Sequence, residues 1–410
     1  MSAPTFAADT TEPEQTAPRD VSLRGDGWGW IDAPIASVDN DQQSSGGNVW
    51  GYSGNEADAA LAASSAGVAL GNTASATVTE DVSVQIENIQ ALDGNVESNA
   101  EGYFGEAGPV STNATAYGNS FTAESENADI GMVSEQTAGA GIIQSRALIE
   151  AADYAQSAAG SATTGANTVS LGAGQAYAGL EAYQSNSAEV AATVDILAPQ
   201  ADVPVAVGTA IAVINNADLG AQGDAALAAA QDNSGAGTAR TRIQADGTIA
   251  SVGTAIITGN NLNMINEGGV GMFAAEQNNS GDLMGQSLLD VGLFGEATST
   301  AAAIGNNASS TTTGSSADIQ TVQNNSGAVI AQALFTGGSG MAATSTATAY
   351  GNAAGGALCN CDGDMSAYNH QTNSGPVRAH TYNLANDAGV LTATSVAAGN
   401  TATYTVGSPD

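Results

Sequence analysis

The sequence predicts an all-β solenoid of about eight units, each roughly 46 residues long, behind a disordered N-terminal lead. Three observations predict this class. A glutamine motif recurs at a nearly constant interval, a Gly-Asn motif recurs in step with it, and small side chains take the place of a large apolar core. We expect an acidic lead with a Trp-containing cap over 1–41, the repeat domain over 42–407 and a tail over 408–410.

The first motif is Gln-Asn-Asn-Ser-Gly, which occurs in full at 277–281 and 323–327. Near copies lie at 231–235 and 371–375, and weaker copies lie upstream. Successive copies begin 46 to 48 residues apart, for example 277 − 231 = 46 and 371 − 323 = 48. Side chains at equal positions of a stacked repeat form hydrogen-bonded ladders. The predicted ladder consists of Gln42, Gln90, Gln136, Gln184, Gln231, Gln277, Gln323 and Gln371.

The second motif is a short Ala/Thr run, one larger residue and then Gly-Asn. Two copies are degraded, around 171–172 and 215–216. The spacing between the Gln motif and the Gly-Asn motif therefore changes between 136 and 216, a change that we call the phase slip. We expect this region to be the least regular. A second predicted ladder consists of Asn72, Asn119, Asn260, Asn306, Asn352 and Asn400.

Each half of a unit reads as a strand and a turn. The Gln motif is followed by Gly-x-(Val/Ile/Leu)-x-(Ala/Gly/Ser), an alternation of period two that indicates a strand. The second half is rich in Thr and Tyr, as in 344–350, and the Gly-Asn pair after it is expected to close a tight turn. The best candidate for a helix of two or three turns is 142–159, where Arg146 and Glu150 accompany a weakly apolar face.

Stacked coils lie ~4.8 Å apart. If each unit forms two coils, the glutamines step by ~10 Å and eight units give a rod of about 75 Å. A propeller is the alternative, because its blades have a similar length. A blade core needs large apolar residues, however, and aromatic residues are only 5% of this chain.

The charge of the chain excludes several functions. Against 41 acidic residues stand six arginines and no lysine, so the formal net charge is −35. A phosphate backbone would repel such a chain, and a P-loop or a Schiff base needs the missing lysine. No run of ~18 apolar residues predicts a membrane span. No cofactor is expected.

The Gln-x-Asn-Ser-Gly-x-Val-x-Ala unit resembles the repeats of curlin-type amyloid subunits. Its long, acidic, lysine-free form is similar to the holdfast-anchor proteins of stalked bacteria, over roughly 42–407. The resemblance implies a surface protein that leaves the cell through a curli-like outer-membrane channel. It also implies that the protein works with other anchor subunits to fix adhesive extracellular polysaccharide to the outer envelope. A protein exported in this way should be made with a cleavable signal peptide, but neither a charged nor an apolar signal region follows Met1. We therefore expect that the sequence is the mature form with an added Met.

Three tryptophans, Trp28, Trp30 and Trp50, lie near the start of the repeats. One interpretation is a cap over the open end of the first coil, and the other is a docking tag or a platform for sugar stacking. At the other end, the strand-like run 401–406 lacks a blocking proline. We expect this C-terminal edge to dock onto a partner or another copy by strand addition.

Cys359 and Cys361 are a candidate disulfide, which requires a local turn; an interchain bridge and a metal site with His370 are the alternatives. The fragment Asp362-Gly-Asp364 lacks the tandem copies of calcium-binding solenoids, so scattered solvated carboxylates are the simpler interpretation.

No catalytic motif accompanies either histidine. The functional alternative is a secreted β-helix lyase or hydrolase acting on polysaccharide, which would need basic residues clustered with acids, whereas the six arginines are scattered along the sequence. Ice or mineral binding, a third class, rests on Thr-x-Thr rows that occur in only some units.

Overall fold

The computed structural model describes residues 36–79, 83–359 and 363–407. Within these ranges the chain forms sixteen parallel strands of one large sheet and no helix, and no membrane-spanning helix is therefore found there. The all-β prediction is confirmed. The first described strand already includes Ala36, six residues before the expected start of the repeats.

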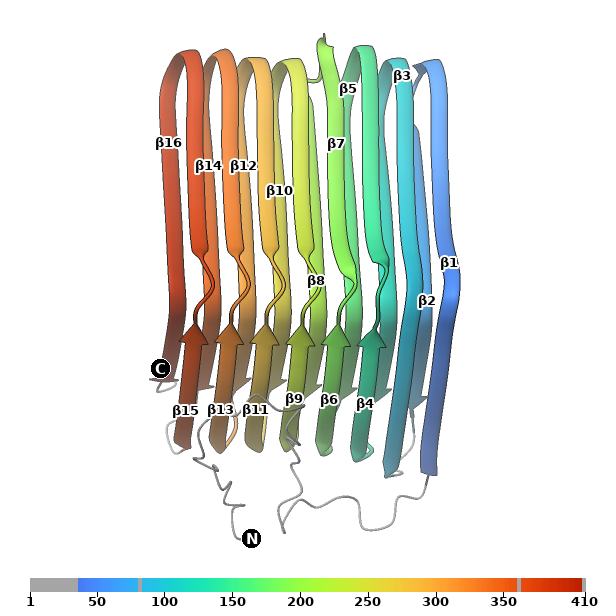
Figure 1. Ribbon diagram of the computed structural model, residues 1–410, viewed down its shortest axis with the longest axis vertical. Coiled ribbons are helices and arrows are strands. Elements are labelled where there is room, and N and C mark those ends of the chain that lie inside the picture. Colours follow the sequence, from blue (N-terminus) through green and yellow to red (C-terminus); the bar gives the residue numbers. More distant parts are fainter. Residues whose placement is uncertain (1–35, 80–82, 360–362, 408–410) are drawn as a thin grey trace.

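From β3 to β16 long strands alternate with short ones, except that β7 and β8 follow each other (Figure 1). The long strands are β1 (Ala36–Ala60), β2 (Ala63–Val78), β3 (Val84–Ser125), β5 (Ile142–Ala173), β7 (Glu189–Asp202), β8 (Val205–Ala221), β10 (Gly237–Asn266), β12 (Leu283–Thr312), β14 (Val329–Cys359) and β16 (Val377–Gly407). The short strands are β4 (Ile130–Ala138), β6 (Ala178–Asn186), β9 (Ala225–Asn233), β11 (Val270–Asn279), β13 (Ser316–Asn325) and β15 (Asp364–Asn373).

Each repeat unit makes a single turn of the chain, which we call a rung. Gln231 pairs directly with Gln184 on one side and with Gln277 on the other. Neighbouring glutamines are therefore one strand spacing apart, ~4.8 Å. The prediction of two coils per unit, with a step of ~10 Å, is wrong. Eight rungs span seven spacings, about 34 Å rather than about 75 Å.

Within a rung the sheet folds back onto itself. In the sixth rung the chain runs along β11, bends at 280–282, continues along the first half of β12 and bends again near Gly292. The second half of β12 then returns against the first, and Ser299 Oγ contacts Ser287 Oγ at 2.9 Å across the interior. Figure 1 shows these bends aligned from rung to rung. The two halves thus enclose a thin core.

The core is built from alternating inward side chains. Alanine supplies many of them, and Phe121, Phe335 and branched residues such as Ile196 fill the wider parts. The buried apolar residues form two separate clusters, one around Ile143 and Val194 and the other around Phe121 and Leu219. A thin interior suits small side chains, because facing halves approach closely.

The predicted helix over 142–159 is wrong, because these residues belong to β5. Burial alternates with period two over 142–147, with Ile143, Ser145 and Ala147 inward. Both β3 and β7 pair with this segment. Pairing with two neighbouring rungs overrides the helix propensity of Ala and Glu.

The predicted Gly-Asn turns are also wrong. Gly305 and Asn306 lie inside β12, and the chain passes through them as strand. The glycine allows a close approach instead. A Cβ at Gly305 would lie 2.4 Å from the carbonyl oxygen of Gly351 and 2.7 Å from Asn325 Oδ1.

The third and fourth rungs depart from the others at the second bend, in the region where the phase slips. The Gln-to-Asn offset is 167 − 136 = 31 and 215 − 184 = 31 there, but 260 − 231 = 29 in the fifth rung. At this bend the fourth rung has one residue more than the third, which breaks the register between β5 and β7, where Tyr154 follows Glu150 as the next paired residue. The break between β7 and β8 lies at the same bend, which rises above its neighbours in Figure 1. The third rung also has one extra residue at the first bend, because 143 − 136 = 7 there whereas 96 − 90 = 6 in the second rung.

Candidate functional site

The eight glutamines form a continuous ladder through the core. Each Nε2 donates to Oε1 of the glutamine in the preceding rung, at 2.7–2.8 Å, in seven successive hydrogen bonds. The same Nε2 also donates to a backbone oxygen of the facing half, as Gln231 does to Asn261 at 2.8 Å. The ladder therefore ties each rung to its neighbour and one half of each rung to the other.

An asparagine ladder runs in the opposite direction. Here Nδ2 of each residue donates to Oδ1 in the following rung, at 2.7–2.9 Å. It contains the six predicted asparagines, Asn215 at one of the two degraded copies, and Asn167, which the sequence motif missed. Asn167 lies at 119 + 48, so the constant interval would have found it where the Gly-Asn motif did not.

A third, shorter ladder lies at the first bend. Its members are Asn186, Asn233, Asn279, Asn325 and Asn373, bonded in sequence at 2.7–3.0 Å. Each Nδ2 also donates to a backbone oxygen two residues on, as Asn279 does to Gly281 at 3.0 Å. This is the third position of the Gln-Asn-Asn-Ser-Gly motif, which explains why that asparagine recurs.

The ladders divide the core into its two apolar clusters. Gln277 and Asn306 are both 0% exposed. A buried amide without partners costs about 1–3 kcal/mol, so partners on both adjacent rungs are needed to keep these groups inside. Slipping a strand by one residue would move every amide to the outer face. The ladders thus fix the register of the stack.

Both ends of the ladders are open within the described residues. At the C-terminal end, Gln371 Oε1 accepts no hydrogen bond from a described residue, and no described rung follows Asn400. At the N-terminal end, Gln42 Nε2 donates only to the backbone oxygen of Thr73, at 3.0 Å. Among the described strands, β16 pairs only with β14 and β1 only with β3.

All four arginines of the described part of the chain lie on one outer surface, which the first halves of strands such as β5, β10 and β16 form. Arg146 and Arg240 share one column of outward positions, and Arg242 and Arg378 occupy the two adjacent columns. We call this surface the arginine face. The arginines are scattered in the sequence but gather on one face of the fold.

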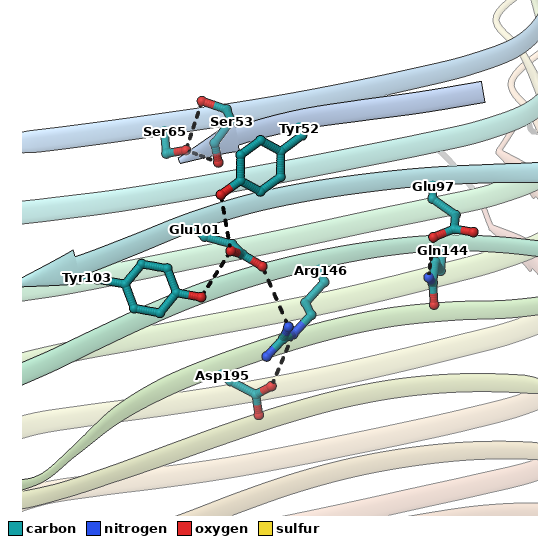
Figure 2. A network of polar contacts seen from close by, with 9 residues as sticks. All are labelled: Tyr52, Ser53, Ser65, Glu97, Glu101, Tyr103, Gln144, Arg146 and Asp195. Atoms are coloured by element: carbon teal, nitrogen blue, oxygen red, sulfur yellow. Dashed lines mark hydrogen bonds and ion pairs between the residues drawn. The ribbon is translucent and has the colours of Figure 1, made fainter. Parts of the chain in front are cut away.

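A polar network occupies the N-terminal part of this face (Figure 2). Glu101 is its centre, because Tyr103 donates to Glu101 Oε2 at 3.0 Å and the Tyr52 hydroxyl lies 3.5 Å from the same oxygen. Arg146 reaches Glu101 at 3.7 Å and Asp195 at 3.8 Å. Burial, with help from the neighbouring Glu101 carboxylate, raises the pKa of Tyr103 to about 12. Tyr103 is therefore a neutral hydrogen-bond donor at physiological pH.

Trp50 lies on the same face and is 73% exposed, and its Nε1 donates to Glu97 at 3.2 Å. It occupies an outward column, beside rather than over the inward side chains of the first rung. Trp28 and Trp30 lie outside the described residues, so the cap stays a prediction. Cys359 is an exposed thiol at the end of β14. Cys361 also lies outside the described residues, and the disulfide likewise stays a prediction. The described residues hold no group of three or more His, Cys, Asp or Glu placed to bind a metal.

The fold and its ladders define a class: an acidic, all-β repeat protein whose rungs are held in register by buried amides. The family described as Holdfast attachment protein D matches residues 55–328. The chain belongs to this family, which implies a role in holdfast attachment and a location at the cell surface. The predicted resemblance to holdfast anchor protein D is confirmed. No curated protein and no solved structure matches the chain.

Proposed function

We propose that this chain is a β-solenoid that serves as a structural, non-enzymatic anchor between adhesive extracellular polysaccharide and the outer cell envelope. In this proposal it stacks, through its terminal rungs, on other holdfast-anchor subunits, after export through a curli-like outer-membrane channel. Family membership supports the attachment role. The resemblance of the repeats to curlin repeats supports export through such a channel and stacking on other subunits.

The single observation that carries the proposal is the unpaired C-terminal rung. β16 is 31 residues long and is paired only with β14 among the described strands. Its apolar side chains include Val390 and Val406, which are 58% and 60% exposed. A long strand with one free edge is a template for strand addition.

The polarity of the ladders favours one mode of stacking. The C-terminal rung offers an acceptor at Gln371 and a donor at Asn400. The N-terminal rung offers the complementary donor at Gln42 and an acceptor at Asn72 Oδ1. The C-terminal end of one chain thus matches the N-terminal end of another chain with the same ladders. Two like ends would place donor against donor.

The test uses a proline at Ala402. Inward residues donate their N–H to the following rung, as Val329 does to Pro376 at 2.9 Å, whereas outward residues such as Ala250 donate to the preceding rung. Ala402 pairs with the buried Ala354 and is inward, so we infer that its N–H points to the free edge. Ala402→Pro therefore removes a docking donor without removing a β14–β16 bond.

We expect Ala402→Pro to weaken association of the purified chain and to release adhesive polysaccharide from cells, while Ala402→Ser keeps both. Association of the wild type should strengthen with salt, because the charge of −35 opposes stacking over the ~8–10 Å screening length. Light scattering at rising salt and retention of polysaccharide on washed cells measure the two effects. If Ala402→Pro associates and retains polysaccharide like the wild type, the stacking proposal fails.

A further inference from the structure

A hollow of about 490 Å³ lies on the arginine face beside the raised bend of the third and fourth rungs. It crosses five strands, β1, β3, β5, β7 and β10, and so spans four rung spacings, about 19 Å. This length suits a short oligomer better than a single small molecule. The residues that matter for its chemistry are Glu56, Tyr103, Glu150, Leu197, Pro199 and Arg242.

The extra residues of the fourth rung build one wall. Between the pairs Ala198↔Ala245 and Asp202↔Gly247, the fourth rung has three residues and the fifth has one. Pro199, one of the extra residues, is exposed and lines the hollow. The phase slip in the sequence thus contributes one wall of the hollow.

The floor combines apolar and polar groups. Leu197 and the ring of Tyr103 are half-buried and supply apolar surface. Tyr103 is held by its hydrogen bond to Glu101, which is in turn held by Arg146. On the far side, Arg242 donates to Gln244 at 2.9 Å, so both ends of the hollow have positioned polar side chains. A fixed aromatic ring with carboxylates and an amide nearby is the pattern that binds sugar rings, whose faces are apolar and whose edges carry hydroxyls.

The charges decide which sugars fit. Glu56, Asp58 and Glu150 line the hollow against one cation, Arg242. An acidic glycan would meet this excess of carboxylates, and the charge of −35 on the whole chain, with repulsion. Neutral pyranose units meet no such repulsion, and their hydroxyls donate hydrogen bonds to carboxylates.

We propose that this hollow binds an uncharged pyranoside chain laid across the rungs, with Tyr103 stacking on one ring and Arg242 and Glu150 bonding to hydroxyls. The proposal deepens the anchor role and rests on it for its biological meaning, since it places the polysaccharide contact on the arginine face. The C-terminal rung then stays free to stack on other subunits.

The experiment is calorimetric titration of the full chain with neutral hexamers, cellohexaose and N-acetylchitohexaose, and with hexagalacturonate as the acidic arm. Neutral probes are needed because a cationic oligomer would adhere to any part of so acidic a chain. We expect saturable binding of at least one neutral hexamer and none of the acidic one. Tyr103→Ala and Arg242→Gln should each weaken binding about tenfold. Tyr103→Phe, which keeps the ring, should change it no more than about twofold.

Matched controls lie on the same face outside the hollow. Tyr382 is 51% exposed and Arg378 is exposed, both on β16. Tyr382→Ala and Arg378→Gln should bind like the wild type. The proposal is overturned if neither neutral hexamer binds, if hexagalacturonate binds equally well, or if the control variants weaken binding as much as the hollow variants. Salt-dependent association of the same samples separates the two proposals, because stacking that persists without sugar binding overturns this inference alone.

Discussion

Gln231 donates from Nε2 to Gln184 Oε1 at 2.7 Å, although 47 residues of chain separate them. Replacing Gln231 by Leu keeps the volume but leaves Gln184 Oε1 and the carbonyl of Asn261 without this donor. We expect a loss of about 3 kcal/mol in the free energy of unfolding, measured by urea denaturation. Gln42→Leu, at the half-buried end of the ladder, should cost about 1 kcal/mol. Equal costs would contradict a ladder that stabilises mainly through its interior members.

Gly327 allows two rungs to meet at the first bend. A Cβ there would lie 2.1 Å from the carbonyl oxygen of Gly281, with only backbone around it. We expect Gly327→Ala to lower the free energy of unfolding by about 2 kcal/mol. Ala188 takes the equivalent place in the fourth rung, so the backbone can shift and the cost should stay moderate. The control is Gly220→Ala, which meets nothing within 4 Å and should leave the urea midpoint unchanged.

Asp218 is the carboxyl group whose burial should be visible in the pH dependence of stability. Burial raises its pKa above the ordinary value near 3.8, although hydrogen bonds from Asn216 and Asn263 oppose the shift. The folded state therefore binds the proton more tightly than the unfolded state, and the contribution of Asp218 to stability falls as pH rises through this range. Asp218→Asn should raise Tm at pH 7, and the gain should disappear at pH 3. Asp290→Asn, at an exposed position, should show no such difference. A gain that is equal at both pH values would exclude the titration of Asp218 as its cause.

Hydrogen exchange should locate the irregular part of the third and fourth rungs. Residues 152–153 and 199–201 have no paired partner in either adjacent rung, so their amides should exchange quickly. The strand segments on either side, such as 143–149, pair on both sides and should be protected as well as 283–289. Peptide-level exchange followed by mass spectrometry makes the comparison. Rapid exchange across the whole of 136–216 would show that the departure is not confined to the bend.

The repeat length and the glutamine column could be predicted from sequence, because a stacked interior demands the same amide at the same place in every rung. The number of turns per unit could not. Gln277 and Asn306 lie on facing halves of a single turn. Two motifs per unit therefore resemble two coils until the pairing of Gln277 with Gln323 is known.

The arginine face and its hollow could not be predicted for a related reason. Arg146 and Arg240 are two rungs apart in the fold but 94 residues apart in sequence, since 240 − 146 = 94. Which outward column each arginine enters depends on the exact register of every intervening rung. Only the insertion near Pro199 left a trace in the sequence, as a change of motif spacing, and its effect on the surface depends on where the bend falls.

The opposite directions of the two long ladders have an electrostatic consequence. Aligned amides add their dipoles along a stack, as peptide groups do along a helix, and a one-way ladder would build partial charges of opposite sign at the two ends. Here seven glutamine bonds point one way and seven asparagine bonds the other. Their dipoles oppose one another, so these two ladders together add little polarisation with each added rung. The four bonds of the third ladder also point to the following rung and have no opposing counterpart, so the field at each end depends on this short ladder together with the carboxylates and the backbone.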